Sequence, residues 1–266
     1  MSKRSVLGID AAWTATQPSG VALISDDGNG WGLVDVHSSY DAFLNEDYVG
    51  PVFRHRGSLP NAGLLLESAR RKAKHEVDLV AVDMPLSLQP IVGRRASDNL
   101  ISAAYGARHA STHSPSQERP GRLSDDLRAA FAVAGYPLAV TSATGPALIE
   151  VYPHPALIEL ASADRRLPYK QAKARKYWPG DGPDGRRANL LRTWREIIDL
   201  IDVKVAGVGD GLMLPSADAP VYALKAFEDA LDAVVCAWVG ACVLDGRARP
   251  YGDETSAIWV PDLAAS

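Results

Sequence analysis

The sequence predicts a single α/β domain, residues 1–266, in which a mixed central sheet carries helices on both faces. Two observations support this fold class. Strand-like and helical patterns follow one another in the order βββαβ over residues 4–82, and two apolar runs each end on a carboxylate, at Asp10 and at Asp83. A chain of 266 residues with an apolar content of 47% can bury a sizeable hydrophobic core.

The N-terminal part begins as a β-meander. Three strand-like segments are separated by Gly- and Pro-containing turn signals, over residues 4–10, 19–25 and 31–37. Apolar and basic positions then recur with helical spacing over residues 61–76, which predicts a helix, and residues 77–82 return to a strand. Pro85 ends that strand, because proline cannot donate a hydrogen bond to a neighbouring strand.

The middle of the chain is interpreted as an insertion at about 87–215, between the fourth core strand and the last acidic helix. Helices are expected near residues 95–106, 123–134, 155–162 and 186–201. A strand-like run at 147–152 stops at a Pro-His-Pro turn. Residues 203–219 are rich in Gly, Asp, Ser and Pro, which predicts a loop.

The longest helical pattern covers residues 221–244 and follows Pro220, a residue favoured at the start of helices. Its last twelve residues carry no charge, which predicts that this helix packs deeply against the sheet. Cys236 and Cys242 lie six residues apart on it, a spacing that favours neither a disulfide nor a metal site, so both are interpreted as core residues. A strand-like run at 257–260 closes the fold.

The formal net charge of −4 argues against a protein that coats nucleic acid, but the charge is unevenly distributed. From Arg165 to Arg195, ten Lys or Arg residues stand against two Asp residues, an excess of +8. No apolar run reaches the roughly 18 residues that span a bilayer, and residues 1–4 lead into a strand-like segment without a signal-peptide core. We therefore expect no membrane partner and a cytoplasmic location.

Four aspartates are candidate ligands of a divalent metal. Asp10 and Asp83 end strands, and Asp229 and Asp232 share one helix face because they are three residues apart. Carboxylates suit Mg²⁺ or Mn²⁺, and two such ions about 4 Å apart assist phosphodiester cleavage. The alternative interpretations are strand termination for the first pair and interaction with the helix dipole for the second. Glu67, on the helix expected at 61–76, is interpreted as solvated rather than as a ligand.

Five basic residues are candidates for contact with substrate phosphates. Lys170, Lys173 and Lys176 are spaced three apart and would share a face if helical, and Arg186 and Arg187 follow a Gly-rich loop. The alternative is a solvated, charged face with no ligand.

Several short motifs occur in an order that resembles a known family. They are Gly8-Ile-Asp-Ala-Ala-Trp13, Val82-Asp-Met-Pro85, Ile149-Glu-Val-Tyr-Pro153, Arg186-Arg187-x-x-Leu190-Leu191 and Asp229-x-x-Asp232-Ala233. Together they resemble the domain-of-unknown-function family numbered 429, whose members are described as predicted nucleases with a ribonuclease-H-like fold. The resemblance covers about residues 5–260.

This resemblance implies a ribonuclease-H-like three-layer fold with a helical insertion. By the same similarity, Asp10, Asp83 and Asp232 match the acidic positions of ribonuclease-H-like enzymes and would hold Mg²⁺ or Mn²⁺. The pair of acids Asp229-x-x-Asp232 is similar to the acidic pair of Holliday-junction resolvases. Glu150 and the basic stretch belong to the narrower family pattern, and Glu150 either reaches the cleft as a further acid or binds a basic residue of the insertion.

We therefore expect a divalent-metal-dependent nuclease that acts on phosphodiester bonds, with nucleic acid, DNA or RNA, as its partner. Asp229 and Glu150 would assist the three metal ligands. One alternative is a nucleotide-dependent phosphotransferase of the actin-like or sugar-kinase-like kind, although such proteins need two similar halves. Another is a nucleic-acid-binding protein that kept the fold and lost catalysis. The sequence does not define the oligomeric state.

Overall fold

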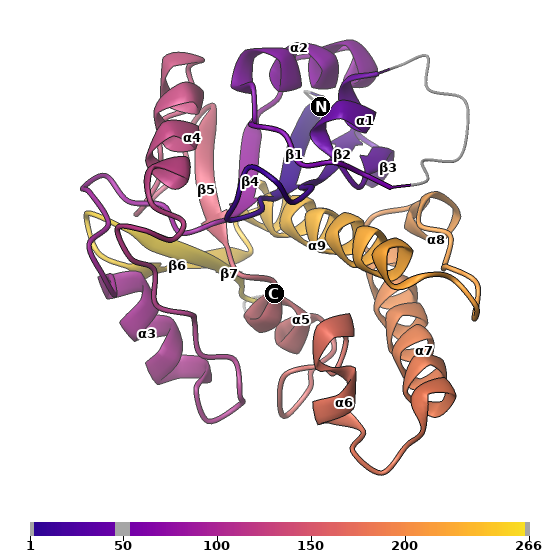
Figure 1. The fold of residues 1–266 in the computed structure, drawn as a ribbon. Coiled ribbons are helices and arrows are strands. Elements are labelled where there is room, and N and C mark those ends of the chain that lie inside the picture. The colour runs from indigo at the N-terminus through magenta and orange to yellow at the C-terminus, as the bar shows by residue number, and fades with distance from the viewer. Residues whose placement is uncertain (1–2, 46–53, 264–266) are drawn as a thin grey trace.

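A seven-stranded mixed sheet lies at the centre of residues 3–45 and 54–263, the part of the chain that the computed structural model describes (Figure 1). The strand order is β3-β2-β1-β4-β5-β7-β6. Strands β1, β4, β5 and β7 run parallel to one another, and β2, β3 and β6 pair antiparallel with their neighbours. The strands are β1 (Arg4–Asp10), β2 (Gly20–Asp26), β3 (Trp31–His37), β4 (Leu79–Asp83), β5 (Ala147–Val151), β6 (Ala248–Gly252) and β7 (Ala257–Pro261).

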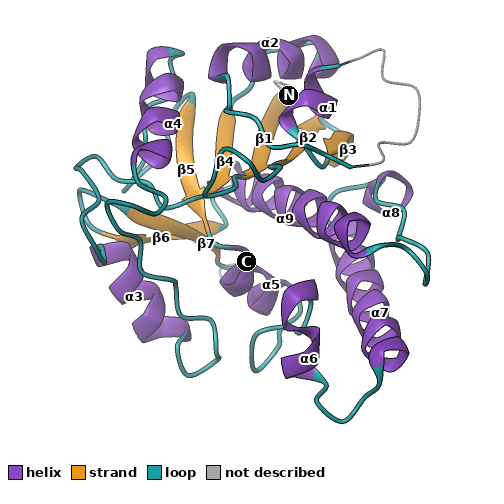
Figure 2. Ribbon diagram, in the orientation of Figure 1, coloured by secondary structure: helices purple, strands orange, loops and turns teal. Residues whose placement is uncertain are grey.

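Helices cover both faces of this sheet (Figure 2). One face packs on α9, α7 and α5, and the other on α1, α2 and α4. The helical segments are α1 (Tyr40–Leu44), α2 (Ala62–Ala73), α3 (Ala96–Tyr105), α4 (Arg122–Val133), α5 (Pro153–Leu160), the 3₁₀ turn η1 (Gln171–Lys173), α6 (Ala174–Tyr177), α7 (Pro183–Asp202), α8 (Val208–Gly211) and α9 (Val221–Leu244).

The alternation of side chains along each strand divides the core into two layers. In β1, Val6 belongs to the α9 layer, whereas Leu7 and Ile9 belong to the α2 layer. In β5, Ile149 faces α9 and Leu148 faces the opposite layer. The direction of a side chain at a strand end therefore follows from its position in this alternation.

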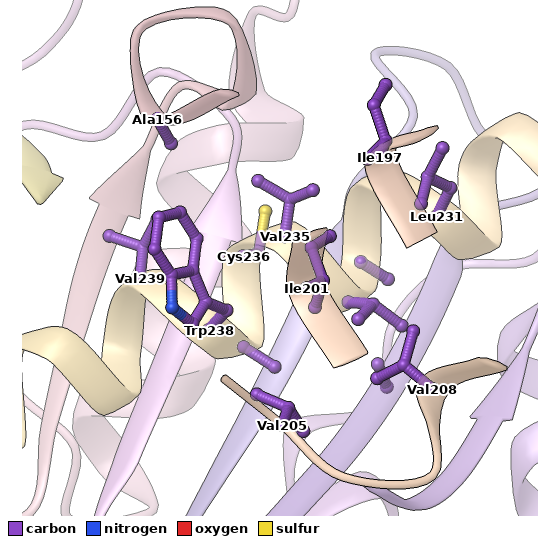
Figure 3. Close-up of a cluster of buried hydrophobic side chains, with 14 of the residues drawn as sticks. Ala156, Ile197, Ile201, Val205, Val208, Leu231, Val235, Cys236, Trp238 and Val239 are labelled. Carbon is purple, nitrogen blue, oxygen red and sulfur yellow. The ribbon is translucent and has the colours of Figure 1, made fainter. Parts of the chain in front are cut away.

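Helix α9 is the main partner of the sheet, and the apolar part of α9 is buried on all sides. Figure 3 shows Val235 and Val239 of this helix in the cluster that also holds Ile197 and Ile201 of α7. Cys236 lies in the same cluster and is a free, buried cysteine, as is Cys242, which confirms the expectation that both are core residues. The burial of α9 on so many sides explains why its second half lacks charges.

Glycines allow α9 to approach the sheet closely. A Cβ atom at Gly8 of β1 would lie 2.2 Å from the carbonyl oxygen of Ala233 and 2.5 Å from the backbone nitrogen of Ala237. A Cβ atom at Gly20, the first residue of β2, would lie 2.0 Å from the carbonyl oxygen of Asp229. These contacts fix the distance between the sheet and the acidic part of α9.

Replacing Gly8 by Ala is expected to destabilise the protein, because the added methyl group would meet backbone atoms that cannot move independently. Overpacking of this kind costs roughly 1–3 kcal/mol or more. Urea unfolding measures the change. The matched control is Gly145→Ala, where a Cβ atom meets nothing within 4 Å and φ is not positive. Equal stability of the two variants would contradict the close approach of α9.

The structure confirms the β-meander, the helices expected near 61–76, 95–106, 123–134 and 221–244, and the strands expected at 77–82 and 257–260. The segment 87–215, interpreted as an insertion, contains β5, which pairs with β4 and β7 inside the sheet. Strand β6 was not expected from the sequence. The expected lack of a signal peptide rests on residues 1–4, and residues 1–2 lie outside the described residues. No helix in the described ranges has the length and apolar character needed to cross a membrane.

Candidate active site

Asp10 and Asp83 lie next to each other at the carboxyl ends of two parallel strands. They are register partners in the pairing of β1 with β4, and neighbouring strands are about 4.8 Å apart. Both occupy positions of the alternation that face α9, as do Gly8 and Ala81 two residues earlier. The structure therefore directs the two carboxyl groups to the same side of the same sheet edge.

Helix α9 brings three further acids to this edge. Glu228, Asp229 and Asp232 are all buried on its N-terminal half. The close contact at Gly20 places the backbone of Asp229 beside this first residue of β2. Gly20 is also the register partner of Asp10. The four aspartates expected from the sequence thus come together, and Glu228 joins them.

The proximity of these acids is visible in their pKa values. Burial raises the pKa of Asp10 to about 7, and the negative charge of Asp229 adds to the effect. Burial also raises the pKa of Asp83 well above its usual range, with further contributions from Asp10 and Asp232. For Asp229 and Asp232, burial raises the pKa to about 6, although a lysine beside each lowers it. The four groups therefore hold protons more tightly than exposed aspartates do.

Two lysines supply the positive charge inside the cluster. Lys170 pairs with Asp232 and lies 3.5 Å from Glu228. Lys225 pairs with Asp229 and lies 3.2 Å from Glu228. Five carboxyl groups thus face two ammonium groups, an excess of three negative charges when every group is ionised. A buried excess of this size requires protons or additional cations.

The segment that carries Lys170 is anchored on both sides. The hydroxyl group of Tyr169 donates a hydrogen bond of 2.8 Å to Asp232, and the backbone N–H of Gln171 donates one of 2.6 Å to Glu228. The indole N–H of Trp194 in α7 donates to the carbonyl oxygen of Tyr169 at 2.8 Å. Lys170 is therefore held in the acidic cluster by its own neighbours.

The donor set fits a hard divalent cation in its chemistry and its charge, since carboxylate oxygens are the ligands that Mg²⁺ and Mn²⁺ prefer. Its arrangement is not that of a preformed site. Across residues 3–45 and 54–263, no group of three or more His, Cys, Asp or Glu side chains is placed to hold a metal ion. Lys170 and Lys225 occupy oxygens of Asp232 and Asp229. A metal would bind after at least one ammonium group had moved.

Glu150 does not join the aspartates. It follows Ile149 in β5, so the strand alternation turns its side chain away from α9. There it pairs with Arg95 at the start of α3, with 2.8 Å between Oε1 and Nη2, and accepts a hydrogen bond of 2.7 Å from the N–H of Leu86. Arg95 also pairs with Asp98 at 2.9 Å. Glu150 thus binds a basic residue, as one of the two alternatives had it, and it also lines a cavity that Asp83 lines.

The five basic candidates lie in different places. Lys170 is in the acidic cluster, Lys173 lines a neighbouring cavity, and Lys176 is exposed. Arg186 donates a hydrogen bond of 2.7 Å to the carbonyl oxygen of Asp181, and Arg187 donates to loop carbonyl groups that precede α9. The last two guanidinium groups therefore hold loops together.

Two adjoining cavities give access to the acids. The first, of about 520 Å³, is lined by Asp10, Asp83, Asp229 and Lys225 among others. The second, of about 460 Å³, shares Asp83 and Lys225 with the first and extends toward α5 and η1. Trp13 lines both. A ligand can therefore reach the acids and the second cavity at the same time.

Sequence reasoning missed Lys225, Glu228 and Arg95. A signal for the first two was present, because Lys225 lies three and four residues before Glu228 and Asp229, a spacing that places all three on one helix face. No comparable signal marks Arg95, since its partner Glu150 is far away in the sequence.

The fold and this cleft define a class of α/β protein in which carboxylates from two parallel strands and one buried helix meet at a sheet edge. The chain belongs to the family described as "Protein of unknown function (DUF429)", which matches residues 8–256. No curated protein and no solved structure matches this chain.

Proposed function

We propose that this protein is a divalent-metal-dependent nuclease with a ribonuclease-H-like fold. The observation that carries the proposal is the excess negative charge of the cleft. Asp10, Asp83, Asp229 and Asp232 converge there, and among the described residues their ion-pair partners are Lys170, on Asp232, and Lys225, on Asp229. A cluster of this kind costs stability unless it binds cations. Retaining that cost at the mouth of a cavity is typical of a functional site.

The arrangement of the strands supports the ribonuclease-H-like part of the proposal. An antiparallel meander, β1 to β3, is followed by β4 and β5, which add in parallel on the other side of β1. This order keeps Asp10 on a central strand, with Asp83 on the adjacent one.

In this proposal Asp10, Asp83 and Asp232 would hold the Mg²⁺ or Mn²⁺, which supplies an activated water and neutralises charge on the phosphate. The hydroxyl group of Tyr169 orients Asp232 through its hydrogen bond. Lys225 lines both cavities, so its ammonium group is placed to bind a phosphate oxygen once it leaves Asp229. The burial of the acids limits the water that competes for them.

The test is cleavage of labelled single-stranded, double-stranded and branched DNA and RNA, with Mn²⁺ or with EDTA. We expect cleavage of at least one substrate that requires Mn²⁺ and is lost in Asp83→Asn. Calorimetry should show Mn²⁺ binding to the wild type and weaker binding to that variant. The matched control is Glu67→Gln, because Glu67 is exposed on α2 and pairs with Arg71 at 2.9 Å.

Cleavage that continues in EDTA, or that survives Asp83→Asn, would contradict the proposal. Nucleic-acid binding without cleavage and without a metal requirement would instead support the non-catalytic alternative.

A further inference from the structure

The second cavity differs in charge from the acidic cluster that it adjoins. Asp83, Arg119 and Lys225 line the end that it shares with the first cavity, whereas Arg166 and Lys173 line the second cavity alone. Neither Arg119 nor Arg166 nor Lys173 forms an ion pair with a carboxylate in residues 3–45 and 54–263. The part of the cavity lined by Arg166 and Lys173 is therefore its basic end.

The carboxylates along these walls already have cationic partners. Glu150 and Asp98 both pair with Arg95. Glu228 lies between Lys170 and Lys225. The positive charge of Arg119, Arg166 and Lys173 is thus left for a ligand.

The basic groups that line this cavity also influence one another's pKa values. Burial lowers the pKa of Lys173, and the charge of Arg166 lowers it further. Burial and then Lys173, Arg166 and Arg119 lower the pKa of His113. The cost of holding like charges together is offset when an anion binds between them.

Two buried polar atoms in the cavity wall lack a hydrogen-bond partner in the described part of the chain, Nε of Arg166 and Nδ1 of His154. His154, at the start of α5, is 5% exposed. Its ring is held edge-on between Tyr152 and Tyr169. Burial and Arg166 keep its pKa well below the usual range, so the ring is neutral at pH 7.

We propose that the basic end of this cavity binds the substrate phosphate next to the one that is cleaved. The substrate is then a nucleic-acid strand whose scissile phosphate lies at Asp10 and Asp83 while the adjacent phosphate lies between Arg166 and Lys173. A volume of about 460 Å³ is within the range of pockets that hold small ligands, as one nucleotide unit requires. Trp13 lies at the junction of the two cavities, and the Arg119 guanidinium group lies over its ring, 5.9 Å from the centroid. A base can stack on the ring face that Arg119 leaves open. This inference rests on the proposed nuclease function.

The test compares two dinucleotides that differ only in a terminal phosphate, titrated into the protein in EDTA so that no cleavage occurs. For the wild type, the terminal phosphate should lower Kd about tenfold or more, as expected for charge-assisted hydrogen bonds. In Arg166→Gln and Lys173→Gln this gain should fall to about twofold, and Arg166→Lys should restore part of it. The matched control is Arg186→Gln, which lies in the same basic stretch but holds a loop and should behave like the wild type.

An equal gain in all variants, or no gain in the wild type, would overturn the inference. Inorganic phosphate is titrated as a further probe. If Arg166→Gln weakens its binding while the terminal phosphate gives the dinucleotide no advantage, the cavity binds free phosphate and the substrate assignment is wrong. Failure of the nuclease proposal is distinguishable, because it removes Mn²⁺-dependent cleavage and leaves the phosphate effect in EDTA intact. Thermal unfolding of each variant verifies that it is folded.

Discussion

Replacing Asp10 by Asn is expected to lower Mn²⁺-dependent cleavage by about 100-fold or more and to raise the melting temperature in EDTA at pH 8. The loss of activity follows from its role as a proposed metal ligand, since even the outer partners of metal ligands are worth roughly 10–100-fold. The gain in stability follows from burial. Asp10 is the register partner of Asp83 and lies close to Asp229, so the ionised form of Asp10 is costly in the folded protein.

The pH dependence of this gain has a definite sign. The pKa of Asp10 rises from 3.8 to about 7 on folding, mainly because of burial. The folded state therefore binds the proton more tightly than the unfolded chain, and its stability falls as the pH rises through this window. The Asn variant lacks this loss. Melting curves of the two proteins should differ little near pH 4 and most at pH 8, where about 2–4 °C corresponds to each kcal/mol.

Asp26 provides the matched control. It lies at the opposite end of the β1–β2 pair, where a hydrogen bond from Arg4 lowers its pKa and the N–H groups of Gly28 and Gly30 lower it further. Asp26→Asn should therefore reduce the melting temperature at pH 8 and leave cleavage unchanged. If both Asn variants shift the melting temperature in the same direction, the electrostatic explanation for Asp10 is wrong.

Replacing Arg95 by Met is expected to be among the most destabilising substitutions in the chain. The side chain of Arg95 is 6% exposed, and those of its partners Glu150 and Asp98 are 4% and 1% exposed. Its guanidinium group also donates to the carbonyl oxygen of Leu86 at 2.7 Å. Removing one partner of a buried ion pair costs roughly 3–5 kcal/mol, because the remaining charges stay buried without compensation. Urea unfolding at pH 7 measures this loss.

The neighbouring arginine is the control for this prediction. Arg94 is exposed, although it donates hydrogen bonds to Asn99 and Ser114, and Arg94→Met should change the free energy of unfolding by about 1 kcal/mol or less. Adding Glu150→Gln to Arg95→Met should recover part of the lost stability, since one uncompensated charge disappears. No recovery in the double variant would show that the loss came from packing rather than from charge.

Most of the fold could be predicted from the sequence because its strands and long helices follow regular apolar patterns. The meander, the strand that ends at Asp83 and helix α9 all belong to this group. Strand β6 could not be recognised, because its five residues include Arg249 and Pro250 and only one of its edges is paired. Proline is tolerated at such an edge strand, but its presence removes the usual sequence signal.

The site could be predicted in part. Strand ends and an i, i+3 pair indicated the four aspartates correctly as neighbours. The direction of Glu150 could not be predicted, because both neighbours of Glu150 in β5 are apolar and both faces of the sheet are buried. Lys170 was expected at a phosphate, and the structure instead has it on Asp232, a pairing that depends on how the segment before η1 folds back onto α9.

The glycine contacts between β1 and α9 have a consequence for biosynthesis. Asp10 leaves the ribosome before the helix that supplies Asp229 and Asp232 has been translated. A nascent polypeptide therefore displays isolated carboxylates and acquires the clustered charge only when α9 closes over Gly8. Any chemistry that depends on the cluster therefore requires that α9 has been synthesised and has packed on the sheet.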